Sequence, residues 1–296
     1  MKFTEGYWEK SERANASHAM QAFIVEEIPN GMQIVAPFHI ITDRSGALDV
    51  GTITIEFTAI RKDVISVRSW HFEGYQRKEP RFELNKDMQD VDVEITDEKA
   101  IMTAGRMQVC VDRKDFKIEY KADGKVLTTC GFRNIGYMQY DRSNSTKFPE
   151  SNYMYSDYTP YMNTELSLAP GECVYGMGER FTSFVKNGQV VDCWNEDGGT
   201  ASQISYKNIP FYMTNKNYGI LVDHTDNVSF EVASEKVEYV GFSVKGEELR
   251  FDLIYGDTMK DVIRTYTDLT GKPALAPGWS FGLWLTTSFT TNYDEE

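Results

Sequence analysis

The sequence has no long apolar run. No stretch of its 296 residues approaches the roughly 20 apolar residues needed to cross a bilayer, and Met1 to Lys10 lacks the apolar core of a signal peptide. We therefore expect no membrane partner and place the protein in the cytoplasm.

Cysteine and histidine are scarce, and basic charge is in the minority. The four cysteines form no C-x-x-C pair and the four histidines show no metal-ligand spacing, so we predict reduced thiols, no metal and no cofactor. With 31 Lys+Arg against 45 Asp+Glu, the net charge of -14 repels phosphate backbones, which excludes nucleic acid as a partner. Neither a serine-nucleophile elbow nor a Walker loop occurs.

Alternation of apolar and polar residues dominates the first 250 residues. It is clear from Thr52 to Phe57 and from Met107 to Val111, and it is typical of strands that bury one face. Asn30-Gly31 and Asp123-Gly124 lie between such runs, as hairpin turns do. The pattern predicts an all-β antiparallel sandwich, with a polar loop between Tyr140 and Tyr161.

The pattern changes near Asp257. Apolar residues recur at helical spacing from Thr258 to Leu269, with Thr258 as a cap and Gly271 as a stop, which predicts one C-terminal helix. The apolar run from Trp279 to Leu285 resembles a strand buried on both faces in a parallel α/β core. We therefore predict a sandwich domain at 1–256, a linking helix at 257–273 and the start of a new domain at 274–296. Left uncovered, this run predicts self-association or disorder beyond about Pro277.

The segment from Val174 to Phe211 is the most unusual. Gly176 and Gly178 suit a bulged strand, and Glu179 with Arg180 could form an ion pair beside them. Trp194 begins the run WNEDGG, in which an aromatic face precedes an amide and two carboxylates. Sugars are bound by such groups, so either a sugar contact or a solvated acidic turn fits this run.

Three segments together resemble glycoside hydrolase family 31: YGMGERF (175–181), WNEDGGTASQISYKNIPFY (194–212) and GKPALAPGWSFGLWLTTSFTTNY (271–293). The phrase WLTTSFTTNYDE is similar to the α-xylosidase branch of that family. Met177 and Glu196 depart from the pattern, since many relatives have Leu and Arg there. The resemblance implies a galactose-mutarotase-like sandwich followed by a (β/α)₈ barrel, which needs about 250 residues and so would be truncated here.

The resemblance also implies a retaining mechanism with two carboxylic acids. In the family both lie in later barrel segments, so we expect no catalytic residue before Glu296. Asp197 matches a loop carboxylate of the leaving-group subsite, with Thr200 close by, and Phe289 matches an aromatic position of the xyloside pocket. With Trp194, these are the predicted substrate-binding residues. The expected partner is an α-xyloside or α-glucoside oligosaccharide, and the protein can form a homo-oligomer.

The leading hypothesis is thus the N-terminal part of an α-xylosidase. A stand-alone carbohydrate-binding module is the alternative, and an aldose epimerase, which needs a converging His and carboxylate, ranks last.

Overall fold

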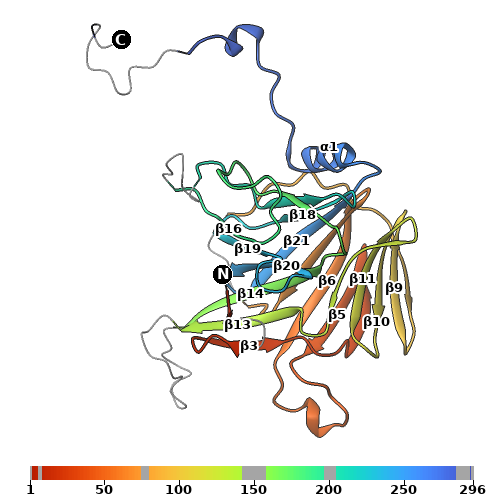
Figure 1. Cartoon of the computed structure of the whole chain (residues 1–296). Helices are drawn as coiled ribbons and strands as arrows, with labels where there is room; N and C mark the ends of the chain where they lie inside the picture. The colour runs from red at the N-terminus through yellow and green to blue at the C-terminus, as the bar shows by residue number, and fades with distance from the viewer. Residues whose placement is uncertain are drawn as a thin grey trace.

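The computed structural model describes residues 2–5, 9–74, 80–141, 158–196, 205–284 and 294. Three antiparallel sheets of eight, six and five strands build the body, and one α-helix and an extended C-terminal arm (271–284) lie at one end of it (Figure 1). The two remaining described strands, β1 (Thr4–Glu5) and β2 (Glu9–Lys10), pair as a two-stranded ribbon. The predicted all-β sandwich with a C-terminal helix is confirmed. The division at 256 and 273 stays a prediction.

The eight-stranded sheet joins the two halves of the chain. Its spatial order is β15 (Val174–Gly176), β17 (Phe211–Thr214), β18 (Tyr218–Val222), β21 (Glu248–Tyr255), β7 (Val64–Trp70), β6 (Thr52–Arg61), β5 (Gly31–Pro37) and β4 (Ile24–Ile28). In its middle, Leu249 of β21 pairs with Ser69 of β7, 180 positions away in the sequence. The predicted turn at Asn30-Gly31 connects β4 and β5, and Asn30 has a φ of 57°.

The six-stranded sheet carries one correction to the sequence prediction. Its order is β16 (Gln189–Cys193), β19 (Val228–Val232), β20 (Tyr239–Lys245), β14 (Tyr158–Ser167), β13 (Ile135–Asp141) and β3 (Ala14–His18). The predicted loop between Tyr140 and Tyr161 is wrong at both ends, because Tyr140 pairs with Thr159 and β14 begins at Tyr158. Ladder pairing with β13 overrides the weak local alternation there. Residues 142–157 lie outside the described part of the chain.

The five-stranded sheet is a meander in which each strand pairs with the next. It runs through β8 (Asp92–Ile95), β9 (Lys99–Ala104), β10 (Met107–Asp112), β11 (Lys117–Ala122) and β12 (Lys125–Gly131). The predicted Asp123-Gly124 turn joins β11 to β12 with φ angles of 49° and 74°, the left-handed pair that a two-residue hairpin loop needs.

The core lies between the eight-stranded sheet and the two smaller sheets. A chain of aromatic contacts crosses it, with ring centroids 5.3–6.4 Å apart: Phe57 to Tyr120, Tyr120 to Phe251, Phe251 to Phe242, Phe242 to Phe230 and Phe230 to Tyr212. Tyr120 comes from the five-stranded sheet and Phe242 from the six-stranded sheet, and both contact Phe251 of β21. All three sheets therefore share one apolar interior.

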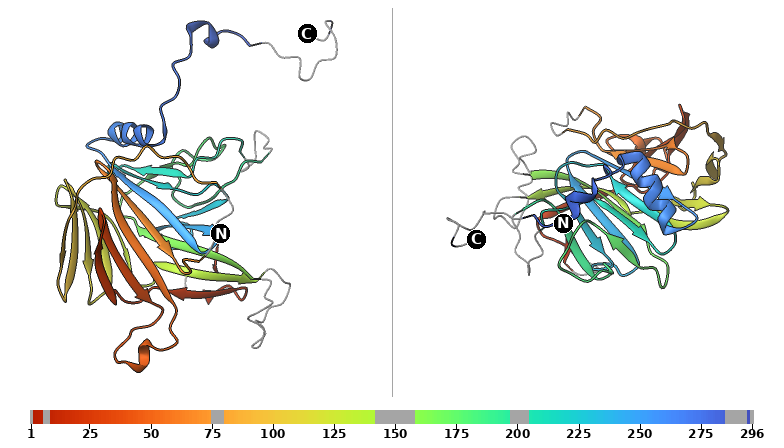
Figure 2. Two further views of the ribbon diagram at one scale, coloured as in Figure 1. Left: turned by 180° about the vertical axis from the view of Figure 1, so that it is seen from behind. Right: turned by 90° about the horizontal axis from the view of Figure 1, so that it is seen from above.

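Helix α1 (Met259–Thr270) covers the opposite face of the eight-stranded sheet (Figure 2). Thr258 caps it, and the Thr258 and Asp261 side chains form a reciprocal capping box. Val262 and Leu269 are buried against Ile254 and Leu221, and the Tyr266 ring stacks on Phe211 at 4.1 Å. The predicted helix is confirmed, including its cap and its stop at Gly271.

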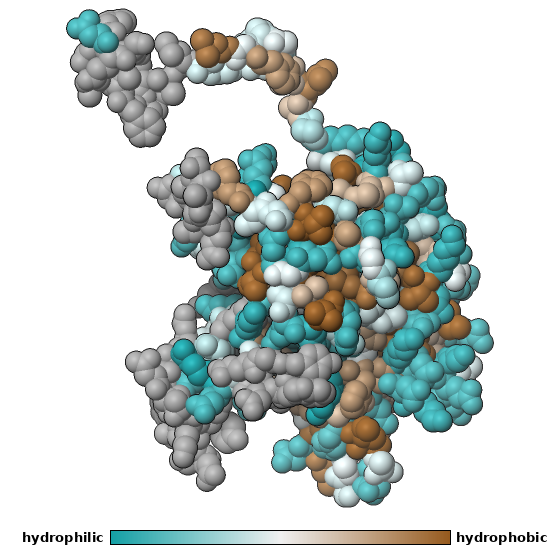
Figure 3. Space-filling model, in the orientation of Figure 1, coloured by the Kyte–Doolittle hydropathy of each residue, from teal (hydrophilic) through white to brown (hydrophobic). Residues whose placement is uncertain are grey.

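The C-terminal arm leaves the body beyond α1. The predicted strand from Trp279 is wrong for the described residues, because a 3₁₀ turn forms at Gly278–Phe281 and no strand follows through Trp284. A strand needs a neighbour to bond to, and the arm has none beside it in any view (Figures 1 and 2). Its apolar side chains stand clear of the body at the top of Figure 3.

Candidate functional site

A groove of about 240 Å³ runs beside β16, the edge strand of the six-stranded sheet. It contains Trp194, the aromatic residue predicted from the sequence, which is 47% exposed. The lining residues are Arg180, Thr182, Gln189, Val190, Val191, Asp192, Trp194, Glu196 and Asn227. The groove thus offers an aromatic face, amides, a guanidinium and carboxylates.

The glycines ahead of the groove turn the chain sharply after β15. Gly176, Met177 and Gly178 all have positive φ, at 118°, 67° and 86°. A Cβ on Gly178 would lie 2.0 Å from the carbonyl oxygen of Lys207, so only glycine fits this crossing. Met177 between them is fully buried and anchors the turn in the core. β15 pairs with β17 in regular register through Gly176, so the glycines form a turn after the strand rather than the bulge that the sequence suggested.

Arg180 follows this turn and ties three segments together. Its Nε donates to the Met177 carbonyl at 3.2 Å, and its Nη2 donates to the Asp192 carbonyl at 3.0 Å and to the Asn208 side-chain oxygen. The suggested ion pair with Glu179 is replaced by another, since Glu179 pairs at 3.4 Å with Lys207, and both side chains are largely exposed. Arg180 positions backbone rather than neutralising its neighbour.

Arg180 and Asn208 together form what we call the clasp, and Asn208 was not identified from the sequence. Its Nδ2 donates to the Trp194 carbonyl at 2.8 Å, to the Asn195 side-chain oxygen at 2.7 Å and to the Ser205 carbonyl at 2.7 Å. Asn195 and Ser205 also form a parallel bridge. These bonds hold together the two ends of the segment 196–205. An asparagine in a loop gives no pattern that would have revealed this role.

Of the four predicted substrate-binding residues, the structure describes Trp194 and places it on the groove with Arg180 and Glu196. Asp197, Thr200 and Phe289 lie outside the described residues. Their assignments stay predictions.

The titratable groups near the groove suit binding better than bond cleavage. Burial raises the pKa of the Cys193 thiol to about 11, which keeps it protonated and a poor nucleophile at neutral pH. Burial, and then the charge of Arg180, lower the pKa of Lys186, whose Nζ donates to the Thr182 hydroxyl and the Ser183 carbonyl. Asp192 and Glu196 also line the groove, and both are exposed.

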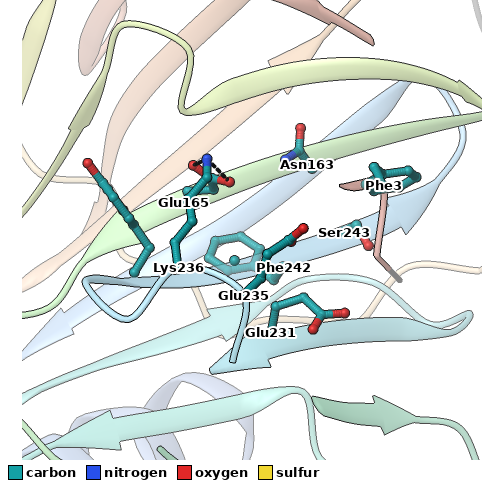
Figure 4. Close-up of a pocket in the computed structure, with 10 residues that line it drawn as sticks. Phe3, Asn163, Glu165, Glu231, Glu235, Lys236, Phe242 and Ser243 are labelled. Atoms are coloured by element: carbon teal, nitrogen blue, oxygen red, sulfur yellow. Dashed lines mark hydrogen bonds and ion pairs between the residues drawn. The ribbon is translucent and has the colours of Figure 1, made fainter. Parts of the chain in front are cut away.

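A second cavity lies on the outer face of the six-stranded sheet (Figure 4). Glu231 and Glu235 approach it from one side, and Lys236 forms an ion pair with Glu165 on the other, at 2.8 Å. Burial raises the pKa of Glu235, and the charges of Glu231 and Glu165 add to the rise. The cavity volume is only about 30 Å³, the space of one water, so a sugar ring does not fit.

One histidine does meet a carboxylate. The Nδ1 of His71 lies 2.7 Å from Glu247, and the Tyr137 hydroxyl donates to the same carboxylate at 2.9 Å. The imidazole stacks on Phe38 and on Tyr137, at centroid distances of 5.7 and 3.9 Å. The His71 and Glu247 side chains bond to each other and pack with Tyr137, whereas an epimerase needs a histidine and a carboxylate that converge on its substrate.

Within the described residues, no three His, Cys, Asp or Glu side chains are grouped to hold a metal ion. No described helix is long and apolar enough to span a bilayer.

The fold and groove define a class, a multi-sheet β-sandwich with a groove that contains an exposed tryptophan at one sheet edge. Residues 54–231 match the family described as the glycosyl hydrolase 31 N-terminal galactose mutarotase-like domain. The chain belongs to this family, as its sequence motifs indicated.

Two curated relatives match the chain along its whole length. The α-xylosidase XylQ of Lactiplantibacillus pentosus is 40% identical over 100% of this chain and 37% of its own length. An α-xylosidase of Emericella nidulans is 40% identical over 100% of this chain and 39% of its own. The chain thus spans well under half the length of these relatives.

Solved structures share the fold. The cycloalternan-forming enzyme of Listeria monocytogenes, solved with a pentasaccharide substrate, superposes with a TM-score of 0.72 at 18% identity, over 92% of this chain and 24% of that one. At this identity the likeness concerns the fold alone.

Proposed function

We propose that the chain is the N-terminal, sugar-facing part of a retaining α-glycosidase that hydrolyses terminal, non-reducing α-xylosyl bonds. Identity of 40% to two α-xylosidases over the whole chain supports the xyloside class. In this proposal the catalytic acid and nucleophile lie outside these 296 residues, and the protein acts in the cytoplasm on an oligosaccharide.

The observation that carries the proposal is Trp194, a half-exposed indole on the groove whose backbone carbonyl is fixed by Asn208. An exposed aromatic face binds the apolar face of a pyranose, and the neighbouring polar groups bond the hydroxyls. Asp197, Thr200 and Phe289 would complete the subsite with Trp194.

Titration calorimetry with an α-xylosyl oligosaccharide tests the groove. We expect weak binding, and Trp194→Ala should weaken it by roughly 1 kcal/mol, about fivefold, because a stacking contact is lost. Trp279→Ala is the control, since that indole is 74% exposed but lies on the arm. Equal losses in both variants, or no binding by the parent chain at millimolar sugar, would argue against the groove.

An aryl α-xyloside assay tests the division of labour. The 296-residue chain should not hydrolyse the aryl α-xyloside, because the proposal places the catalytic acid and the nucleophile outside it. Sustained hydrolysis by this chain at an enzyme-like rate would refute that placement. Tight, micromolar sugar binding without turnover would instead favour the alternative, a stand-alone carbohydrate-binding module.

A further inference from the structure

One wall of the groove beside β16 is a short loop, residues 182–189, which we call the wall loop. Thr182 and Gln189, at its two ends, line the groove. Asn187 ties the loop to the body, because its side-chain oxygen accepts from the Val174 amide at 2.9 Å. Two backbone N–H groups of the loop also donate to β15 and β19, at 2.8 and 2.7 Å. The path of the loop is therefore set mainly by its backbone and by Asn187.

Lys186 is the buried centre of the wall loop. Only 4% of the residue is exposed, and its Nζ donates to the Thr182 hydroxyl oxygen at 3.1 Å and to the Ser183 carbonyl at 2.8 Å. In the described part of the chain no carboxylate pairs with this ammonium, and the charge that acts on it is the like charge of Arg180. A buried cation without a partner of opposite charge lowers stability, which favours a functional role for this lysine.

The contact with Lys186 fixes the direction of the Thr182 hydroxyl. An ammonium group has N–H donors and no acceptor, so the Thr182 oxygen must accept at this contact. Its own proton is therefore turned away from Lys186, and none of the described residues accepts it. Because Thr182 is exposed and lines the groove, this proton is available to a ligand there.

Other polar groups on the groove present the opposite polarity. The Gln189 side-chain nitrogen donates to two backbone carbonyls of the wall loop, at 3.3 and 2.8 Å, which leaves only its oxygen for a ligand. Asp192 and Glu196 are acceptors when ionised. These groups suit the hydroxyl protons of a sugar. The ring and glycosidic oxygens of a sugar carry no proton and can only accept, so they need a donor such as Thr182.

We propose that Thr182 is a substrate-binding residue whose hydroxyl donates to the ring or glycosidic oxygen of a sugar, and that Lys186 is the residue that positions this donor. The inference rests on the proposed function, because it needs a sugar stacked on Trp194. It adds a source of specificity, since the Thr182 donor selects for an acetal oxygen whereas the carboxylates select for hydroxyl groups.

Titration of the 296-residue chain with methyl α-xyloside, followed by the Trp194 indole N–H signal in NMR spectra, measures the role of Thr182. We expect Thr182→Val to weaken binding roughly fivefold, because one hydrogen bond to the sugar is lost. Thr182→Ser keeps the hydroxyl and should bind nearly as well as the parent chain. Thr42→Val is the matched control, because that threonine is also exposed and lies outside the groove.

Sulfur analogues of the sugar test the role of Lys186. Sulfur is a weak hydrogen-bond acceptor, so a sugar with sulfur in place of the accepting oxygen gains little from the Thr182 donor. Thr182→Val and Lys186→Met should each weaken binding of the oxygen sugar roughly fivefold, but should weaken binding of either the ring-sulfur or the glycosidic-sulfur analogue less than about twofold. A lysine that only supported the loop would affect all three sugars alike. Methionine fills a similar volume and Asn187 still holds the loop, so Lys186→Met should fold, which circular dichroism verifies.

The outcomes separate this inference from the proposed function. Binding that Trp194→Ala weakens but Thr182→Val leaves unchanged would overturn the inference and leave the proposed function intact. Equal losses for oxygen and sulfur sugars in Lys186→Met would overturn the positioning role of Lys186. Absence of binding by the parent chain at millimolar sugar would overturn both.

Discussion

At Gly178 two backbone segments cross more closely than a side chain allows. Gly178 and Gly188 have almost the same φ, 86° and 84°, but a Cβ meets the Lys207 carbonyl at the first and open space at the second. Gly188→Ala should lower the free energy of unfolding by about 1 kcal/mol, because alanine disfavours the left-handed backbone. Gly178→Ala should lower it by at least twice that amount. Urea unfolding measures both. Equal losses would show that the crossing relaxes without cost.

Asp252 is a fully buried carboxyl on β21 that faces Ser66 across the ladder. Burial raises its pKa to about 7, the Ser66 hydroxyl opposes this rise, and the charge of Asp223 adds to it. The unfolded chain releases this proton near its ordinary pKa of about 3.9. Between about pH 4 and pH 7 the folded state therefore binds more protons, and stability falls as pH rises.

Asp252→Asn should remove this slope. Relative to the variant, the parent chain should lose on the order of 4 kcal/mol between pH 4 and pH 7 and change little above pH 7. Denaturant unfolding at several pH values measures the difference, with the exposed Asp115→Asn as control. A pH dependence that is the same in parent and Asp252→Asn would mean that the buried carboxyl does not titrate in this range.

At the scale of the element, substitutions in α1 measure how much the N-terminal cap contributes to the stability of the helix. Thr258→Ala removes the cap of the first turn and should destabilise α1 by about 1 kcal/mol. Thr267→Ala lies in the helix interior, where alanine is the better helix former, so it should gain a few tenths of a kcal/mol. Amide hydrogen exchange in α1 measures both, and a loss of protection in both variants would contradict the assignment of the cap.

Sequence patterns predicted those elements whose stability is local. The alternation in β6 and β10, the Asp123-Gly124 turn and the Thr258 cap are all set by neighbouring residues. β14 was missed at Tyr158–Tyr161, because its strand is imposed by ladder bonds to β13. The strand predicted at Trp279 failed for the converse reason, since a buried strand needs partners that lie beside it.

The candidate site likewise contains residues that the sequence predicted and residues that it did not. Trp194 and the Gly176–Gly178 turn were visible as an aromatic beside polar residues and as a paired glycine. The clasp was not, because Arg180 and Asn208 act on carbonyl groups that only the fold brings together. The contact between His71 and Glu247, 176 positions apart, was equally hidden.

At the scale of the whole molecule, Phe251 joins the three sheets through Tyr120 and Phe242. Phe251→Ala should lower the free energy of unfolding by about 3–5 kcal/mol, because it leaves a cavity where the sheets meet. All three sheets should still melt in one transition, with far-ultraviolet dichroism and tryptophan fluorescence coincident.

Phe72→Ala provides the comparison, since Phe72 is 59% exposed and its loss should stay within about 0.5 kcal/mol. Two separated transitions in the Phe251 variant would show that the five-stranded meander is a unit of its own.

The ladder between β7 and β21 also bears on how the chain is made. β7 ends at Trp70, but its partner residues Glu248–Ile254 emerge from the ribosome about 180 residues later. At a synthesis rate of roughly 5–20 residues per second, β7 waits on the order of ten seconds or more with an open edge. The nascent chain is then exposed to mispairing, and a holding chaperone would be most useful during that interval.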